Sequence, residues 1–452
     1  MAIKVKLGDL LDLLTDYHAN GAYKKLKENV ELLDAPDFAV MIRTTNFEQN
    51  NFESQLKFIT EHAYNFLKKS KVYAGDIIMN KIANAGSSYL MPELGKQVSL
   101  AMNLFLLRID PLKANPVYVF LYLKLNEAYV KSFANGSVTK TITKEAVRNL
   151  DIELPERYIQ DEVVNTYFRF TDKIEVNKKT NQTLEQMAQA LFKSWFVDFD
   201  PVIDNALAAG NPIPDELQVR AELRQRVIAE RTTNPKLKPL PDDIQQLFPS
   251  EFEESELGWI PKEWFSGALA SLARYSTSRM DGSELTLENY ISTENMLTNK
   301  QGVTKASSIP SLKSAPSFIT GQVLISNIRP YFKKIWLASS NGGRSNDVLG
   351  FESLESKTEA YLMNLLSQDQ FFDFMMTTSK GSKMPRGDKK AIMDWGVVVP
   401  PVKIRKFYSN LVEGFYSANS IRTKENDSLV QLRDTLLPKL ISGELKINKD
   451  VA

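Results

Sequence analysis

The strongest constraint in this sequence is an internal repeat. Gly136-Ser137 returns as Gly381-Ser382, 245 positions later, and at the same offset residues 144–147 (KEAV) are matched by residues 389–392 (KKAI). The similarity continues from Gly136 to Phe196 without a gap. Self-similarity over such a length indicates that one structural unit occurs twice in the chain. The repeated unit is predicted to be a mixed α/β domain followed by a long helix.

Weaker matches extend the repeat upstream. Residues 74–78 (AGDII) resemble residues 320–324 (TGQVL) at an offset of 246, and residues 44–47 (TTNF) resemble residues 293–296 (TENM) at an offset of 249. Small insertions in loops explain the drift of the offset. The chain is therefore interpreted as a tandem duplication.

The region between the two copies has a different composition. It holds eight prolines, at positions 201, 212, 214, 235, 239, 241, 249 and 261. Such a density interrupts regular structure and marks a connector, although residues 215–230 are amphipathic and suit a short helix within it. The predicted order is a first mixed domain (1–157), a first long helix (158–200), the connector (201–256), a second mixed domain (257–401), and a second long helix with the C-terminal tail (402–452). The predicted fold class is α+β, with two similar mixed α/β domains separated by an antiparallel pair of long helices in a pseudo-two-fold arrangement.

Both long segments carry the pattern of a packed helix seam. Residues 158–196 contain no proline or glycine, and the second copy runs from Lys403 to about Leu437. Neutral and apolar residues recur at alternating spacings of four and three, which is the heptad pattern of helices that pack side by side. These positions are 170, 174, 177, 181, 184, 188, 191 and 195 in the first helix, and 415, 419, 422, 426, 429, 433, 436 and 440 in the second. The seam is polar midway, and polar seam residues fix the register at some cost in stability.

The length of these helices suggests a spacing device. At 1.5 Å per residue, a helix of about 37 residues is roughly 55 Å long. Antiparallel pairing would hold the two domains at opposite ends, on the order of one and a half turns of B-DNA apart, given about 34 Å per turn. Domains held in this way would contact two short sequences separated by an unread gap. A helical hairpin that only docks the two domains is the alternative, and periodicity alone leaves both open.

Composition excludes several classes of function. The chain has 452 residues, no cysteine and only two histidines, His18 and His62, so disulfides, thiolate sites and histidine metal clusters are excluded. The formal net charge of +1 excludes a strongly basic tail but not a local basic face. No apolar run of 18 residues suggests a membrane span, and no signal peptide is recognised, so we expect a cytoplasmic protein.

Catalytic motifs were sought and not found. The sequence has no phosphate loop of the Gly-x4-Gly-Lys-Ser/Thr type, no Gly-x-Ser-x-Gly elbow, and no Asn/Asp-Pro-Pro-aromatic run of the kind that amino-methyltransferases use. Asp198 and Asp200 form a carboxylate pair that suits a metal ion, but Asp200-Pro201 more simply ends the helix. We therefore predict no catalytic residue, no metal site and no bound cofactor in this chain.

Each repeat places a polar, basic, glycine-containing loop before its last strand. Glycine lets the backbone approach a surface closely, serine, threonine and lysine contact phosphates, and the fork of an arginine binds a guanine edge with two hydrogen bonds. The candidate DNA-contacting residues are Ser137, Lys140, Thr141 and Lys144 in the first loop (135–144), and Ser382, Lys383, Arg386 and Lys389 in the second (380–390). A solvated turn without function is the alternative for both loops.

Two further pairs of segments carry residue types that contact nucleic acid. Arginine and asparagine read guanine and adenine, and interleaved basic and aromatic residues suit the DNA backbone. The candidates are Arg43, Thr44 and Asn46 in residues 42–47, Thr293 and Asn295 in residues 291–296, Lys81 and Asn84 in residues 80–84, and Arg329, Tyr331 and Lys333 in residues 326–334. Residues 276–279 (STSR) are a weaker candidate. An ordinary surface loop is the alternative for each.

Three motifs resemble one known family, the specificity subunits of type I restriction-modification systems. Residues 191–202 (LFKSWFVDFDPV) resemble its central region, residues 257–264 (LGWIPKEW) its entry into a second target-recognition domain, and residues 432–445 (LRDTLLPKLISGEL) its C-terminal end. Together with the repeat, the similarity covers nearly the whole chain.

The resemblance implies a non-catalytic subunit that reads double-stranded DNA. In that family each target-recognition domain reads one half of a bipartite site, and a coiled coil of the two helices sets the spacing. Methyltransferase (M) subunits dock on the specificity subunit, and restriction or motor (R) subunits join to cleave DNA; S-adenosylmethionine, ATP and Mg would be bound by these partners. The aromatic residues of the central motif are then expected to dock a partner, with an intramolecular core as the alternative: Phe192, Trp195, Phe196 and Phe199.

Two other functions are alternatives: a fused restriction-modification enzyme and a scaffold that binds only proteins. A self-contained restriction-modification enzyme of the fused type would need nuclease and methyltransferase motifs, which this chain lacks. A coiled-coil scaffold that binds only proteins would bind DNA equally well after Arg386 or Lys140 is changed to alanine. The target sequence, the length of its gap, the subunit stoichiometry and the DNA affinity without partners do not follow from the sequence.

Overall fold

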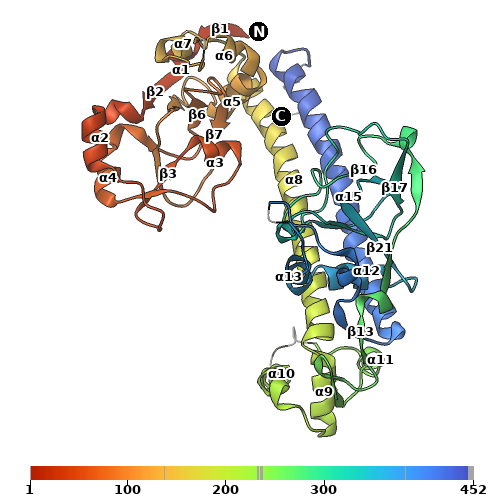
Figure 1. The fold of residues 1–452 in the computed structure, drawn as a ribbon. Coiled ribbons are helices and arrows are strands. Elements are labelled where there is room, and N and C mark those ends of the chain that lie inside the picture. Colours follow the sequence, from red (N-terminus) through yellow and green to blue (C-terminus); the bar gives the residue numbers. More distant parts are fainter. Residues whose placement is uncertain (1, 137, 232–233, 235–237, 382, 446–452) are drawn as a thin grey trace. The chain divides into compact units, whose positions relative to one another are not determined.

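The computed structural model describes residues 2–136, 138–231, 234, 238–381 and 383–445 (Figure 1). The chain divides into two compact units, residues 1–175 with 426–452, and residues 176–425. Helices α8 (Arg157–Phe192) and α15 (Val402–Ile441) both cross this boundary, so each unit contains one end of each helix. Among the described residues, no helix combines the length and the apolar character that crossing a membrane requires.

The first domain is built on two four-stranded sheets and a small two-stranded one. One large sheet has the order β2-β9-β6-β7, the other β4-β3-β8-β5, and β1 pairs with β10. The strands are β1 (Ile3–Lys6), β2 (Leu11–Asp16), β3 (Ala39–Ile42), β4 (Phe58–Ile59), β5 (Lys71–Val72), β6 (Ile77–Asn80), β7 (Ser88–Leu90), β8 (Gln97–Leu100), β9 (Leu104–Ile109) and β10 (Asp151–Leu154). Its helices are α1 (Leu7–Leu10), α2 (Tyr23–Asn29), α3 (Thr44–Glu48), α4 (Glu61–Phe66), α5 (Pro116–Leu125), α6 (Glu127–Ser132) and α7 (Lys144–Arg148).

The second domain repeats this plan. Its large sheets have the orders β14-β21-β18-β19 and β15-β17-β20-β16, and β13 pairs with β22. The strands are β13 (Phe265–Ala268), β14 (Ala273–Tyr275), β15 (Arg279–Asp281), β16 (Tyr290–Ile291), β17 (Ser314–Phe318), β18 (Val323–Ser326), β19 (Ile335–Leu337), β20 (Gly342–Arg344), β21 (Val348–Ser353) and β22 (Gly396–Val399); β11 (Phe252–Ser255) and β12 (Gly258–Pro261) form a hairpin before them. Its helices are α12 (Glu359–Leu366), α13 (Asp369–Thr377) and α14 (Lys389–Met393).

Strand order and direction show that the two domains share one topology. In the first domain β3 is parallel to β8, which is antiparallel to β5; in the second, β16 is parallel to β20, which is antiparallel to β17. Only the fourth strand of this sheet differs, since β4 joins β3 whereas β15 joins β17. The predicted mixed domain that occurs twice is therefore confirmed at the level of strand pairing.

A polar contact at the same place in both domains also shows that the domains are equivalent. Asp76 precedes β6 and binds Arg108 on β9, with its two oxygens 2.7 and 2.8 Å from the guanidinium nitrogens. At the corresponding positions Gln322 precedes β18 and donates a hydrogen bond to Glu352 on β21, at 2.8 Å. The two domains thus keep a cross-strand polar contact while using different residues, as expected of copies that have diverged.

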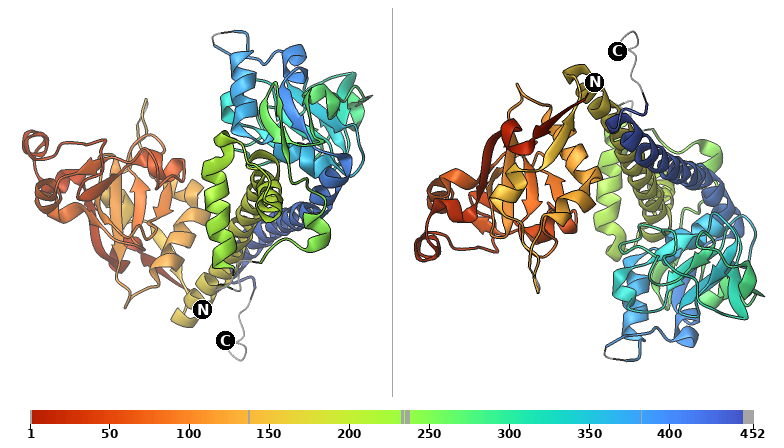
Figure 2. Two further views of the ribbon diagram at one scale, coloured as in Figure 1. Left: turned by 90° about the horizontal axis from the view of Figure 1, so that it is seen from below. Right: turned by 90° about the horizontal axis from the view of Figure 1, so that it is seen from above.

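The long helices pair antiparallel in the second unit, where α8 (yellow) and α15 (blue) lie side by side (Figures 1 and 2). The Tyr408 hydroxyl donates to the Ala188 carbonyl at 2.8 Å, and further along the pair the Asn177 amide donates to Glu425 at 2.8 Å. Residue numbers therefore rise on one helix as they fall on the other. All sixteen predicted seam positions are buried or half-buried, and the antiparallel pair predicted from the heptads is confirmed.

The polar middle of the seam is connected by hydrogen bonds. The Asn181 amide donates to the Asn419 carbonyl at 3.4 Å, and the Asn419 amide donates to Glu185 at 2.5 Å. Burial raises the pKa of Glu185, and the hydrogen bond from Asn419 opposes that rise. Because these polar groups find partners only when the helices are correctly aligned, the section favours one register.

The end of α8 forms part of the core of the second domain. Phe192 lies 5.1 to 5.8 Å, between ring centroids, from Phe196, Tyr361 and Tyr408. The helix continues as a π-helical turn (Lys193–Val197) and the helical path is interrupted at Phe199, whose φ of 54° is left-handed. The predicted end of this helix near Asp200 is thus close to the observed one, and aromatic packing holds it in the interior.

The connector is more regular than its prolines suggest. Helix α9 (Asp200–Ala209) begins with Pro201 in its first turn, where a proline costs no hydrogen bond, and is followed by a 3-10 turn (Asp215–Leu217), α10 (Gln218–Glu230) and the short α11 (Asp242–Gln245). The predicted short helix over 215–230 is therefore present, and α9 was missed. Proline density was misleading here because one of the prolines starts a helix.

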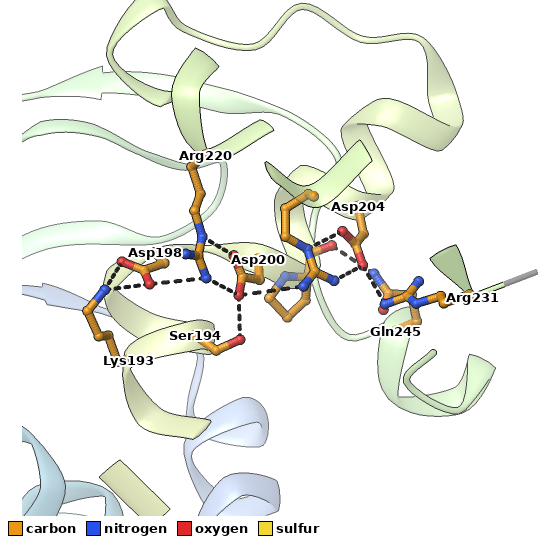
Figure 3. A network of polar contacts seen from close by, with 10 residues as sticks. Lys193, Ser194, Asp198, Asp200, Asp204, Arg220, Arg231 and Gln245 are labelled. Atoms are coloured by element: carbon orange, nitrogen blue, oxygen red, sulfur yellow. Dashed lines mark hydrogen bonds and ion pairs between the residues drawn. The ribbon is translucent and has the colours of Figure 1, made fainter. Parts of the chain in front are cut away.

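Ion pairs join α9 to α10 (Figure 3). Arg220 binds Asp200 through two hydrogen bonds of 2.7 Å, and Arg224 binds Asp204 through hydrogen bonds of 2.5 and 2.7 Å. Asp200 is 4% exposed and also accepts a hydrogen bond from Ser194 at 2.7 Å. Two-pronged contacts of this kind are stronger than single ones, so they fix α10 against α9 within the connector.

The core role of α8 can be tested by truncating one ring. Phe192→Ala is expected to destabilise the second unit by about 3–5 kcal/mol, because a fully buried phenylalanine leaves a cavity when removed. Met187→Ala, on the same helix with 50% of the residue exposed, serves as the control and should change stability far less. Urea denaturation of both variants measures the difference, and equal midpoints would contradict this account of the core.

Candidate nucleic-acid interface

Two of the predicted loops come together in the first domain. Residues 135 and 141 exchange two backbone hydrogen bonds of 2.8 Å, which closes the loop 135–144 into a narrow hairpin. The neighbouring loop 80–84 attaches to it, since Ile142 N–H donates to the Lys81 carbonyl at 3.0 Å and Ala83 N–H donates to the Lys140 carbonyl at 3.1 Å. We call loops 80–84 and 135–144 the first loop pair.

The second domain builds the same arrangement from loops 326–334 and 380–390, the second loop pair. Residues 380 and 386 exchange backbone hydrogen bonds of 3.0 and 3.1 Å, and Arg329 N–H donates to the Pro385 carbonyl at 2.8 Å. Ala83 and Arg329, which make the equivalent bond, both have left-handed backbones, with φ of 67° and 51°. The two loop pairs therefore share a backbone geometry that their sequences do not reveal.

Each hairpin also needs its glycine. Gly136 has φ of 129°, and a Cβ atom there would lie 2.4 Å from the Thr139 carbonyl oxygen, which is too close for any side chain. Gly381, at the equivalent position, has φ of 98°. Both values favour glycine, so the turn itself requires the glycine that the two repeats share.

The loop pairs present different side chains on this common backbone. Lys140 and Thr141 in the first hairpin correspond to Pro385 and Arg386 in the second. Pro385 is buried and Arg386 is exposed, whereas Lys140 is exposed and Thr141 half-buried. The exposed predicted residues are Asn84, Lys140, Tyr331, Lys383, Arg386 and Lys389. Ser137 and Ser382, also predicted, lie outside the described residues.

In the first loop pair a single carboxylate holds two of the predicted lysines. Asp16, at the end of β2, lies 3.1 Å from Lys81 Nζ and 3.1 Å from Lys144 Nζ, and its side chain is 10% exposed. Burial alone would raise the pKa of Asp16, but hydrogen bonds from Lys144 and Lys81 outweigh it and lower the pKa below its usual value. Asp16 therefore joins the two loops, and sequence reasoning missed it because an isolated aspartate carries no motif.

The second loop pair contains a more open ion pair. Arg386 Nη2 lies 3.2 Å from Asp347 Oδ2, with 54% and 38% of the two side chains exposed. Lys333, another predicted residue, lies 3.0 Å from Asp369 and is more covered, at 29%. Arg386 is thus a cation of this loop pair that keeps a large accessible surface.

The predicted base-reading asparagines have a structural role instead. Asn46 and Asn295 are 3% and 6% exposed. The Asn46 side chain accepts from Arg43 N–H at 3.0 Å and donates to the Asn51 carbonyl, while that of Asn295 accepts from Ser292 N–H at 2.7 Å and donates to the backbone. Because these amides are buried and hydrogen-bonded within the chain, they do not present their edges to a base. Their neighbours Arg43, Thr44 and Thr293 are half-buried.

Four aromatic residues predicted to dock a partner are interior. Phe192, Trp195, Phe196 and Phe199 are 1%, 2%, 7% and 7% exposed and belong to the core of the second domain. A partner protein cannot contact rings that are covered by the chain's own side chains. The prediction of partner docking at these residues is wrong for this structure, and the intramolecular core that was its alternative is what the structure shows.

The carboxylate pair Asp198 and Asp200 is engaged by basic side chains. Lys193 and Arg220 bind Asp198, and Arg220 and Arg224 lie beside Asp200 (Figure 3). Cations already occupy the places that a metal ion would need. Across the part of the chain that the structure describes, no group of three or more histidine, aspartate or glutamate side chains is arranged to hold a metal ion.

The known proteins that this chain resembles are specificity proteins of type I restriction systems. Residues 3–186 match the family model described as the type I restriction modification DNA specificity domain. Over 408 residues the chain is 25% identical to the type I restriction enzyme HindI specificity subunit of Haemophilus influenzae, covering 83% of this chain and 88% of that protein. It is also 22% identical to the MjaIX specificity subunit of Methanocaldococcus jannaschii over 342 residues, covering 75% of this chain and 71% of that one.

Over most of its length the chain is thus similar to type I restriction-modification specificity subunits. In fold it resembles the crystal structure of a type I S subunit from M. genitalium, with a TM-score of 0.52 and 13% identity, over 97% of this chain and 96% of the other. The resemblance noted in the three sequence motifs is thereby confirmed. Both of these relatives are named as specificity subunits of type I restriction enzymes.

The contact made by Asp16 can be tested through its pH dependence. Asp16→Asn keeps the shape of the side chain and removes the charge, and should cost about 1 kcal/mol at pH 7, after allowing for the partly exposed lysines. Because the folded-state pKa of Asp16 lies below the ordinary 3.8, this stabilisation is full above that value and is lost as the pH falls through the folded-state pKa.

Urea denaturation between pH 7 and pH 3 measures this difference. Asp12→Asn, at an exposed position on the same strand, is the matched control and should have little effect. A cost for Asp16→Asn that is the same at every pH would show that the charge is not what stabilises the loops.

Proposed function

We propose that this specificity subunit reads a bipartite DNA target, with one half-site bound by each loop pair. The observation that supports this most directly is the common backbone geometry that presents different side chains, Lys140 and Thr141 in one domain and Pro385 and Arg386 in the other. Main-chain geometry sets how closely a loop approaches DNA, whereas side chains at the base edges decide the sequence. Two such surfaces suit two half-sites of different sequence.

The helix pair is proposed to set the distance between the half-sites. The two helices contain 36 and 40 residues, and the polar middle of the seam fixes their register in the second unit. A rigid pair in a fixed register suits a constant gap better than a flexible linker would, because a flexible linker gives a distribution of distances. This favours a spacing device over a hairpin that only docks the domains.

The same subunit is proposed to bring methyltransferase and motor-nuclease subunits to the target. This part rests on the family, in which S-adenosylmethionine, ATP and Mg belong to the partners. The four interior aromatic residues of the second core are no longer candidates for the docking surface, for the reason given above.

A methylation map tests the proposed function in the organism that carries the gene. Deleting the gene is expected to remove adenine methylation from one motif made of two short sequences with an unread gap, and restoring it should return that motif. An unchanged map, with the chain still bound to other proteins, would instead indicate a scaffold that binds only proteins.

The length of the gap should follow the length of the helices. Inserting seven residues into α8 after Lys178 and seven into α15 after Lys424 preserves the heptad and lengthens the pair by about 10 Å at 1.5 Å per residue. At about 3.4 Å per base pair, the methylated motif is expected to gain about three base pairs in its gap while both half-sites stay the same.

The control for this experiment is insertion into one helix alone. That change breaks the antiparallel register and should abolish methylation rather than shift the gap. A motif with an unchanged gap after the double insertion would show that the helices do not set the distance.

A further inference from the structure

The exposed ion pair of the second loop pair, Arg386 with Asp347, has hydrogen-bonding groups that remain accessible to a ligand. Arg386 is 54% exposed, and only its Nη2 atom is within hydrogen-bond distance of Asp347, at 3.2 Å. A guanidinium carries five N–H donors, so most of its hydrogen-bonding edge is left for a ligand. Asp347 is 38% exposed and offers acceptor oxygens beside it.

The backbone that carries these two residues is fixed from several directions. Asn327 N–H donates to the Asp347 carbonyl at 2.8 Å, and the Asn327 side chain donates to the Gly387 carbonyl at 3.2 Å. Asn327 is 5% exposed, so a buried residue connects the segment before β21 to the hairpin that presents Arg386. The backbone positions from which Asp347 and Arg386 extend are therefore held close together.

The carboxylate decides what the arginine is able to bind. A phosphate group approaching Arg386 would meet the negative charge of Asp347, and like charges at close range repel. A guanine edge is neutral and presents two acceptors, O6 and N7, to the fork of an arginine, while its paired cytosine presents an N4 donor that suits a carboxylate. Arginine beside aspartate thus complements the major-groove edge of a G·C base pair and opposes a phosphate.

The first domain lacks this pair at the same place. Thr141 occupies the position of Arg386, and Asn103, whose carbonyl accepts from Lys81 N–H at 2.8 Å, occupies that of Asp347. Threonine has no fork with which to bind both guanine acceptors. At this position, therefore, only the second loop pair carries a side chain whose fork can bind both guanine acceptors.

We propose that Arg386 and Asp347 form a recognition pair for one G·C base pair, and that this base pair belongs to the half-site read by the second domain. Arg386 binds O6 and N7 of the guanine, and Asp347 is the positioning residue that orients the guanidinium and turns away phosphates. The inference rests on the proposed function, because it assigns a base to a surface already proposed to read DNA.

Methylation maps of strains carrying single variants test this assignment. For Arg386→Ala, one half-site of the methylated motif should lose its requirement for one guanine, while the other half-site stays unchanged. Arg274→Ala is the matched control, since Arg274 is also an exposed arginine bound to a carboxylate, Glu352, but lies on β14 outside the loop pair; its motif should equal that of the wild type.

Binding by the complex purified from the host through a tag on the chain identifies the contacted atom. Replacing the assigned guanine by 7-deazaguanine removes N7, and should weaken wild-type binding by about five- to 150-fold while leaving the binding of Arg386→Ala unchanged. Asp347→Asn is expected to bind unrelated DNA more tightly than the wild type does, with a steeper salt dependence, because phosphates are no longer repelled.

The results that would contradict the inference differ from those that would contradict the proposed function. If Arg386→Ala weakens binding to all sequences equally and reduces the salt dependence, Arg386 contacts a phosphate and the inference is wrong while the proposed function stands. The same conclusion follows if neither half-site requires a guanine that depends on Arg386. If the wild-type strain shows no bipartite motif at all, the proposed function itself fails and the inference fails with it.

Discussion

The fold depends on where the two ends of helix α8 are buried. Near its start, Val163 and Val164 belong to the core of the first domain, together with Leu437 and Ile441 from the end of α15. At its other end, Ala188 and the rings from Phe192 to Phe199 belong to the core of the second domain, together with Ile404 and Tyr408 from the start of α15. Neither domain completes its core from its own sheets alone. Each requires both helices, so the helices are structural parts of the domains rather than linkers between them.

Much of this architecture could be predicted from the sequence because it is periodic. The repeat around Gly136 and Gly381 predicts two copies of one domain, and the spacing of four and three predicts the antiparallel helix pair. Both signals survive divergence, since a turn that needs a positive φ keeps its glycine and a seam keeps its alternation of buried positions. Periodicity did not show whether Phe192 and the rings after it face the chain's own core or a partner protein. Aromatic residues suit an interior and a docking surface equally well, and only the packing of the second domain decides between them.

The sequence predicted which loops form the candidate site, but it did not predict the role of each side chain in them. Loops 80–84 and 135–144 were both selected from composition, yet the bonds that join them involve backbone groups, which carry no residue signature. Asn46 is a suitable residue for reading adenine and equally suitable for closing a turn, and burial assigned it to the turn. Asp16 and Asp347 were missed for a related reason. Each acts through a partner that is distant in sequence, so neither stands in a recognisable pattern.

The loop pairs are joined by main-chain hydrogen bonds, and this has an evolutionary consequence. A substitution at Thr141 or Arg386 changes the side chain that is presented and leaves the backbone hydrogen bonds of the hairpin in place, because those bonds involve only N–H and carbonyl groups. The backbone of each hairpin thus tolerates variation at the positions that present different side chains in the two domains. Under the proposed function, single amino-acid changes at these positions would give a lineage of such proteins new targets while the hairpins keep their backbone bonds, and the two domains would diverge from each other at different rates.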